Sequence, residues 1–260
     1  MLTSLQIGQN GRLGNQMFQY AALVGTAFVR GYDWKLQDNE NVVLRKVFKM
    51  PNAKILTQKD VDKLKYRYFE QSFDFNPGLF LVEDFTDIHG HFQSASYFSD
   101  AFDYLKEDFE FVDNLKATAQ YHINTHRKGK RICSLHVRRG DYLTKSDYHP
   151  PCTLEYYKKA KQIVNESTGG DVTFLCFGDD HDWIAKNLID DQSKLVFGNT
   201  PEVDFCMMTM CDAHIIANSS FSWWAATLGN VSSVIAPLNW FGPAGPKKWQ
   251  TVYINGWVIV

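Results

Sequence analysis

The stretch HVRRGDY at 136–142 follows an apolar run, ICSLHV, and places several polar side chains close together. Alternation along a strand puts His136 and Arg138 on one face and Arg139 on the other, with Asp141 just beyond. The planar guanidinium of arginine suits bidentate binding of a phosphate, and the end of a strand holds it rigidly. A solvated turn with internal ion pairs is the alternative interpretation.

A second candidate anion site is the stretch NSSFSWWAA, which begins at Asn218. A strand pattern stops there and a helix pattern begins, so the hydroxyl groups of Ser219 and Ser220 and the free backbone amides converge on one spot. The start of a helix favours an anion. The alternative is an ordinary N-cap made by one of the two serines, with Trp223 and Trp224 packed in the core.

The third candidate is the glycine-rich stretch GQNGRLGNQMFQYA near the N-terminus. Gly11 and Gly14 allow close approach of the backbone, while Arg12, Asn15 and Gln16 bring hydrogen-bond donors to the start of a helix. The spacing matches neither GxGxxG nor GxxxxGK[ST], so it does not support a dinucleotide or Walker-type loop. A loop that closes over a ligand from a facing domain fits better, and a plain tight turn is the alternative.

Carboxylates at two further places in the sequence are candidates for a functional role. Asp180 and Asp182 in GDDHDW have a spacing that would suit Mg²⁺ or Mn²⁺ beneath a nucleotide phosphate. The position of Asp182 directly before Trp183 favours a helix N-cap instead, so we expect no metal site. Asp204 falls in the first turn of an expected helix, where it is either a surface carboxylate or an acceptor for the N–H groups of a base.

The elements that must position these residues are indicated by hydrophobic periodicity. We expect a strand over 2–7, a glycine turn and a helix that Gly31 ends, which is the start of an α/β unit. Residues 40–128 indicate only mixed structure, apart from a helix in KATAQYHINTHRKGK. The expected strands beyond that point are ICSLHV, VTFLCFG, KLVF, HIIA and SSVIAP, with helices at 154–167, 182–189 and 202–211 and one after NSSFS.

Strands that alternate with helices at this spacing indicate a parallel sheet covered on both faces. The basic turn RKGK interrupts the pattern near 128–130, so the sequence predicts two α/β domains, 1–128 and 129–260. In such sheets, ligands sit beyond the carboxyl ends of the strands. The polar stretches after the apolar runs are therefore the residues to test for function.

Composition limits the classes of function. A chain of 260 residues with 45% apolar and 22% charged residues is globular, and its net charge of −2 gives no basic field for nucleic acid. No apolar run approaches the roughly 18 to 20 residues that cross a bilayer, and the start MLTSLQIGQNGRLGN is unlike a signal peptide. The five cysteines form no CxxC pair, which favours a reducing compartment. We expect a cytoplasmic protein.

Together, these motifs resemble the α-1,2-fucosyltransferases of glycosyltransferase family 11, and they share pieces with the wider superfamily of α-1,6- and protein O-fucosyltransferases. The resemblance covers nearly the whole chain and rests on GRLGNQMFQYA, GHFQSASYF, HVRRGDY, EYYKKA, FGDDHDW, DFCMMTMCDAHIIANSSFSWWAA and IAPLNWF. The arginine motif followed by NSSFSWW is its most specific part. The chain is short for the family, which leaves the acceptor and linkage less defined than the donor.

The resemblance implies a GT-B-like fold, with two Rossmann-like domains facing each other across a cleft and GDP-fucose held mainly by the C-terminal one. Arg138 would bind the β-phosphate, and Asp141 would orient the arginines or act as the base. His136 and Asp204 would meet the guanine, and Arg139 would be structural or contact the donor. The implied donor-binding residues are His136, Arg139, Asp204, Asn218, Ser219, Ser220, Phe221, Ser222, Arg12, Gly14, Asn15 and Gln16.

The family's reaction is inverting and needs neither a metal nor a cofactor. The implied partners are a GDP-sugar donor and a galactose-containing glycan acceptor, with membrane contact at most through a lipid-linked acceptor. A carboxylate paired with an arginine is a weak base, so Glu83 and Asp84 stay alternatives to Asp141. Two other functions stay open: transfer of another GDP-sugar on the same scaffold, and glycan binding without catalysis.

Overall fold

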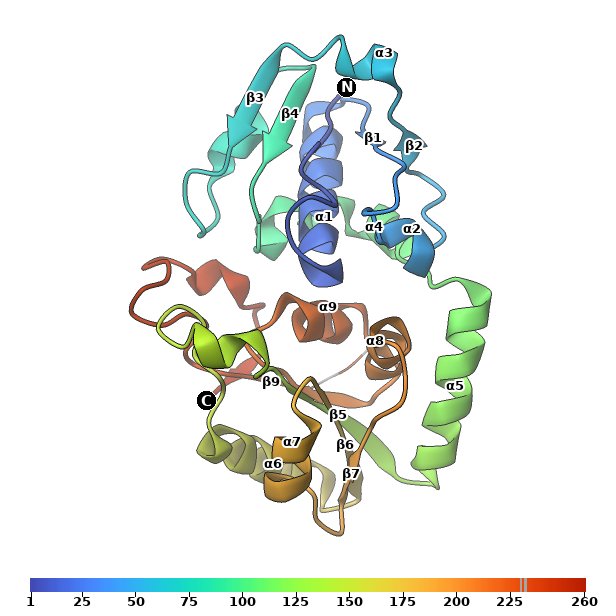
Figure 1. The fold of residues 1–260 in the computed structure, drawn as a ribbon, viewed down its shortest axis with the longest axis vertical. Helices are drawn as coiled ribbons and strands as arrows, with labels where there is room; N and C mark the ends of the chain where they lie inside the picture. The colour runs from blue at the N-terminus through green and yellow to red at the C-terminus, as the bar shows by residue number, and fades with distance from the viewer. Residues whose placement is uncertain (230, 232) are drawn as a thin grey trace. The chain divides into compact units, whose positions relative to one another are not determined.

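The computed structural model describes residues 1–229, 231 and 233–260 (Figure 1). The chain divides into two compact units, Met1–Val112 with Lys248–Ile254 and Asp113–Lys247 with Asn255–Val260. The division falls at the start of helix α5 (Asp113–Arg127), upstream of the turn at 128–130. Helix α5 packs against α8 (Pro201–Thr209), and Arg127 forms an ion pair with Asp212, with 2.7 Å between Nη1 and Oδ2. These contacts attach α5 to the second unit.

The first unit contains short parallel strand pairs. β1 (Lys35–Leu36) pairs with β2 (Lys54–Ile55), and β3 (Tyr66–Phe69) pairs with β4 (Thr86–His89). Single parallel bridges join Leu2 to Trp34 and Thr3 to Asp87, so the N-terminal segment connects the two pairs. The predicted strand over 2–7 is wrong beyond Thr3, because residues 5–9 form turns.

Helix α1 (Leu13–Arg30) is the main buried element of the first unit and confirms the prediction of a helix ended by a glycine. Gly31 caps it in the left-handed conformation, with φ of 67°. The remaining helical segments of this unit are α2 (Leu44–Val47), α3 (Gln58–Val61), α4 (Phe102–Asp108), and the 3₁₀ turns Pro77–Leu81, Ala95–Tyr97, Ser99–Ala101 and Gln250–Val252. All but the last of these segments belong to the mixed structure that the sequence indicated for 40–128.

The second unit is built on a six-stranded parallel sheet with strand order β10-β9-β8-β5-β6-β7. Its strands are β5 (Arg131–Val137), β6 (Val172–Gly178), β7 (Ser193–Leu195), β8 (Ala213–Ile215), β9 (Val234–Ala236) and β10 (Val258–Ile259). The parallel sheet confirms the prediction from the apolar runs; β10 was not foreseen. Read from β7 to β10, the order is the one found in dinucleotide-binding folds.

Helices cover both faces of this sheet (Figure 1): α6 (Leu154–Thr168) and α7 (His181–Asn187) lie on one side, and α8 and α9 (Ser220–Leu228) on the other. The core beneath them includes Leu135, Phe174 and Ile215, which are fully buried. All five cysteines are unpaired thiols and buried. Among the described residues, no helix has both the length and the apolar character that a membrane span requires.

Candidate functional site

The two strongest anion-binding motifs follow neighbouring strands of the second unit. HVRRGDY continues from β5, and NSSFS follows β8, which pairs with β5 in the sheet. The strand order reverses between these two strands, since β6 and β7 extend from one side of β5 and β8 begins the other side. Ligands of open α/β sheets bind at such a reversal, beyond the carboxyl ends of the strands. The tertiary structure therefore brings both motifs to a favourable position.

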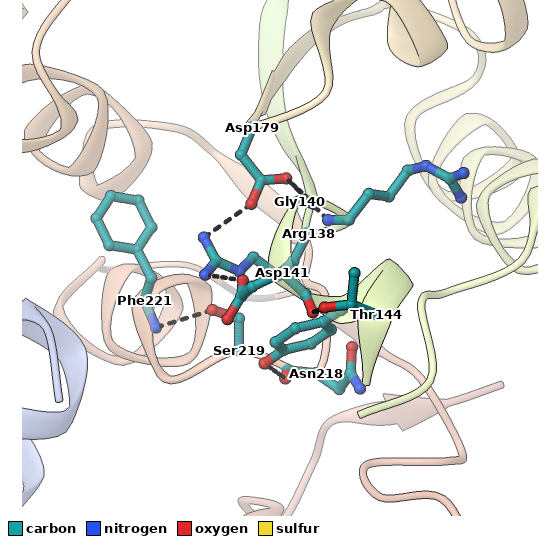
Figure 2. Close-up of polar contacts among 10 residues, drawn as sticks. Arg138, Gly140, Asp141, Thr144, Asp179, Asn218, Ser219 and Phe221 are labelled. Carbon is teal, nitrogen blue, oxygen red and sulfur yellow. Dashed lines mark hydrogen bonds and ion pairs between the residues drawn. The ribbon is translucent and has the colours of Figure 1, made fainter. Parts of the chain in front are cut away.

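Arg138 lies between two carboxylates at this edge of the sheet, as Figure 2 shows. Its Nη2 donates to Asp141, and its Nη1 lies 2.8 Å from Oδ2 of Asp179. The guanidinium also lies over the ring of Tyr142, 5.4 Å from the centroid. With 17% of its side chain exposed, Arg138 is a partly desolvated cation held by neighbours on three sides.

Asp179 anchors the loop that carries the arginine, and the sequence analysis missed it. Its Oδ1 accepts hydrogen bonds from the backbone N–H of Arg139 at 2.8 Å and of Gly140 at 3.1 Å. A Cβ at Gly140 would lie 2.9 Å from Oδ2 of Asp179, so a side chain there would crowd the carboxylate. The sequence contained one signal for Asp179, namely its position directly after the strand β6, which pairs with β5 in the sheet.

Arg139 is held by a different set of contacts from Arg138. Its Nε lies 3.0 Å from Oδ2 of Asp180, and its guanidinium lies 4.5 Å from the ring centroid of Trp183. Both partners belong to the N-terminal end of α7. These contacts fit a structural role for Arg139 in joining the β5 loop to α7.

The N-cap of α7 is Asp180, so the prediction that Asp182 caps this helix is wrong. Helix α7 begins at His181, and the Asp180 side chain accepts a hydrogen bond from the backbone N–H of Trp183 at 3.1 Å. Asp182 is an exposed carboxylate in the first turn. Within the described part of the chain, no three His, Cys, Asp or Glu side chains are grouped to hold a metal ion.

His136 is buried at the end of β5 and stays uncharged near neutral pH, because burial lowers its pKa to about 4. Its ring lies 5.5 Å from the ring of Phe221, and its Nδ1 has no hydrogen-bond partner among the described residues. Phe221 also contacts Phe205, next to Asp204 in α8. Burial raises the pKa of Asp204, whose Oδ1 accepts a hydrogen bond from Asn199 at 3.0 Å.

The start of α9 confirms the capping interpretation of NSSFS. Ser219 is the N-cap, and its hydroxyl accepts a hydrogen bond from the backbone N–H of Phe221 at 3.4 Å (Figure 2). Trp223 and Trp224 are fully buried, as that interpretation required. A capped helix start still presents the positive end of its dipole, so the cap does not conflict with anion binding.

Asn218 and Ser222 of this motif form hydrogen bonds within the second unit. The Asn218 side chain donates two 3.0 Å hydrogen bonds, to the carbonyls of Pro150 and Trp240. Its backbone carbonyl accepts a 3.0 Å bond from the hydroxyl of Tyr142, the residue whose ring lies beneath Arg138. The buried Ser222 hydroxyl donates to the carbonyl of Ala217 at 3.3 Å. Asn218 thus fixes the start of α9 against the arginine loop.

The glycine-rich motif lies in the first unit, around the start of α1. Arg12 occupies the N-cap position and is exposed, while Gly14 is buried in the first turn. Oδ1 of Asn15 accepts a 3.0 Å hydrogen bond from Gln93, in the stretch GHFQSASYF. The buried Gln16 donates to the carbonyl of Asn41 at 2.9 Å and accepts from the backbone N–H of Val43 at 3.0 Å. Gln16 therefore holds a loop.

The alternative carboxylates for a base are also in the first unit. Asp84 forms an ion pair with the N-terminal ammonium of Met1, and Glu83 is exposed. Asp141 belongs instead to the arginine site. The structure therefore leaves Asp141 beside the cation that would hold a phosphate, whereas Asp84 has a partner of its own.

Comparison with known proteins identifies the family of this chain. The model of glycosyl transferase family 11 matches residues 2–260, so the chain belongs to that family and is a glycosyltransferase. The chain is 30% identical to "Alpha-1,2-colitosyltransferase" of Escherichia coli over 93% of its own length and 96% of the relative's. It is 26% identical to "Galactoside alpha-(1,2)-fucosyltransferase 1" of Mus musculus, over 88% of this chain and 64% of the mouse protein.

Solved structures show the same fold at low sequence identity. Fucosyltransferase NodZ from Bradyrhizobium has a TM-score of 0.55 at 12% identity, covering 95% of this chain and 94% of NodZ. POFUT1 in complex with GDP-fucose has a TM-score of 0.50 at 11% identity, covering 82% of this chain and 89% of POFUT1. The chain thus has the α/β fold of the GT-B-like class, as the sequence predicted.

Proposed function

We propose that this glycosyltransferase moves L-fucose from GDP-fucose to O-2 of a galactose residue in a glycan acceptor, with inversion and without a metal. The observation that carries the proposal is the position of Arg138 and the start of α9 at the reversal of strand order. The family match and the names of the relatives support sugar transfer from a nucleotide donor. NodZ was also solved after soaking with GDP-fucose.

The chemistry follows from the charges at this site. As the bond from sugar to phosphate breaks, positive charge grows on the anomeric carbon and negative charge on the departing GDP. The Arg138 guanidinium and the positive end of α9 are fixed donors that stabilise this negative charge. Attack by the acceptor hydroxyl on the face opposite GDP inverts the anomeric centre, and Asp141 is the proposed base for the hydroxyl proton.

The proposed guanine contacts are His136, Phe221 and Asp204. Phe221 offers an aromatic face beside the uncharged His136, whose buried Nδ1 has no hydrogen-bond partner among the described residues. A carboxylate can accept from the ring N–H and amino group of guanine, which adenine cannot both supply; Asp204 is the candidate. This arrangement would favour GDP over ADP.

A second candidate donor is GDP-colitose, because the similar protein from Escherichia coli is named as a colitosyltransferase. Colitose is fucose without its 3-hydroxyl group, so both donors present the same diphosphate to Arg138. The two donors differ only in this hydroxyl group, so a polar group that binds it in fucose would have no partner in colitose. Measuring kcat/KM for GDP-fucose, GDP-colitose and GDP-mannose with a galactose-terminated acceptor identifies the donor.

The test of the phosphate role compares Arg138→Ala with Arg139→Ala. Removal of a fixed donor of this kind costs about 3 to 4 kcal/mol, so Arg138→Ala should lower kcat/KM by roughly 150- to 900-fold. Arg139→Ala removes a neighbouring arginine whose contacts are with Asp180 and Trp183, and we expect a much smaller loss. Product linkage is read by NMR, and each assay is run once with EDTA and once with added metal instead. Retained turnover by Arg138→Ala, or a requirement for added metal, would contradict the proposal.

A further inference from the structure

The two carboxylates that hold Arg138 are themselves held very differently. Asp179 accepts from two backbone N–H groups as well as from Arg138 Nη1, and 28% of its side chain is exposed. Asp141 has 44% of its side chain exposed, and Arg138 is the sole hydrogen-bonding or ion-pair partner of its carboxylate among the described residues. Asp179 is therefore fixed by the loop, whereas Asp141 is tied only to the guanidinium.

A diphosphate that binds Arg138 at a terminal nitrogen meets a carboxylate that is already bonded there. Both terminal nitrogens already donate to a carboxylate, one to Asp141 and one to Asp179. Displacing Asp179 would also disturb its two hydrogen bonds from the backbone N–H groups of Arg139 and Gly140, so three contacts of one carboxylate would be affected together. Displacing Asp141 breaks one exposed pair, and such pairs are weak.

We propose that Asp141 is an exchangeable counterion of Arg138: the donor diphosphate replaces Asp141 at Nη2, while Asp179 keeps Nη1 in place. This inference rests on the proposed function, because it takes the anion to be the diphosphate of a GDP-sugar. It makes Asp179 a positioning residue for the arginine. It also links two roles of Asp141, since its carboxylate is released for the acceptor hydroxyl only when a donor occupies Arg138.

The exchange predicts that Asp141 weakens the binding of GDP. Asp141→Asn removes the competing anion with little change in size, so calorimetry should show GDP binding about three- to tenfold tighter than in the unmodified protein. Asp182→Asn is the matched control, because it removes the same charge from an exposed carboxylate in the first turn of α7 that does not pair with Arg138. Asp179→Asn should weaken GDP binding, because the guanidinium loses its fixed partner.

The outcomes separate the exchange from the proposed function. Asp141→Asn binding GDP no more tightly than Asp182→Asn would overturn the exchange, and so would equal tightening by Asp179→Asn. Failure of the unmodified protein to bind GDP would instead refute the donor site itself. Thermal unfolding of each variant establishes that it is folded before titration. The kcat of Asp141→Asn gives a second readout: tighter GDP binding with slower transfer is expected.

Discussion

His214 is a buried, uncharged histidine in the sheet of the second unit, and it should make the fold sensitive to acid. It lies opposite Ser134 in the register of β5 and β8, with 2.6 Å between its Nδ1 and the serine hydroxyl. Its side chain is fully buried, and Nε2 has no partner among the described residues. Burial lowers its pKa from 6.5 to about 3, because a charged ring there would lose its hydration.

The sign and size of the effect follow from this difference in pKa. The unfolded chain takes up a proton at His214 below pH 6.5, whereas the folded chain does not do so until about pH 3. The stabilisation from the uncharged ring is therefore fully present above pH 6.5 and is lost as the pH falls toward 3. Between pH 8 and pH 5 the loss from His214 is about 2 kcal/mol, at 1.36 kcal/mol per pH unit below 6.5.

The assay compares urea unfolding of the unmodified protein with that of His214→Asn at pH 8 and pH 5. Asparagine keeps an acceptor near the Ser134 hydroxyl and cannot titrate, so the variant should be less stable at pH 8 but lose about 2 kcal/mol less on acidification. His181→Asn controls for the loss of one exposed histidine. Equal losses of stability by the unmodified protein and His214→Asn between the two pH values would refute the assignment of this acid sensitivity to His214.

Two further predictions concern residues that position the motifs. Asn218→Ala should lower the free energy of unfolding by about 2 to 4 kcal/mol, because the carbonyls of Pro150 and Trp240 lose their hydrogen-bond donors. Urea titration measures this change, and a loss below about 0.5 kcal/mol would contradict the prediction. Gly25→Ala should lower the melting temperature by several degrees, because the new Cβ would lie 2.1 Å from the carbonyl oxygen of Tyr97. An unchanged melting temperature would show that helix α1 and the backbone at Tyr97 can move apart without cost.

Local patterns in the sequence determined much of the second unit. Apolar runs bounded by polar turns located β5, β6 and the helix α6 between them, because buried parallel strands and amphipathic helices leave distinct periodicities. Short strands were harder to predict from the sequence. The segment after Thr3 forms turns instead of the predicted strand, and a 2.9 Å hydrogen bond from the backbone N–H of Leu5 to the Asp87 carboxylate helps to hold it. The predicted N-cap of α7 was the wrong aspartate, because GDDHDW contains several carboxylates. Which of them caps the helix depends on the backbone geometry at the helix start, which the sequence does not record.

The sequence by itself determined which residue types stand at the ends of the strands, and so the chemistry that the site could perform. Only the tertiary structure decided that β5 lies between β8 and β6, which brings Arg138, the start of α9 and Asp179 to one edge. That order depends on crossover connections and helix packing between residues far apart in the chain, which no local periodicity records. Long-range packing also placed Asp179 against the backbone of Arg139 and Gly140, whereas Asp141 reaches the same arginine from only three residues along the chain.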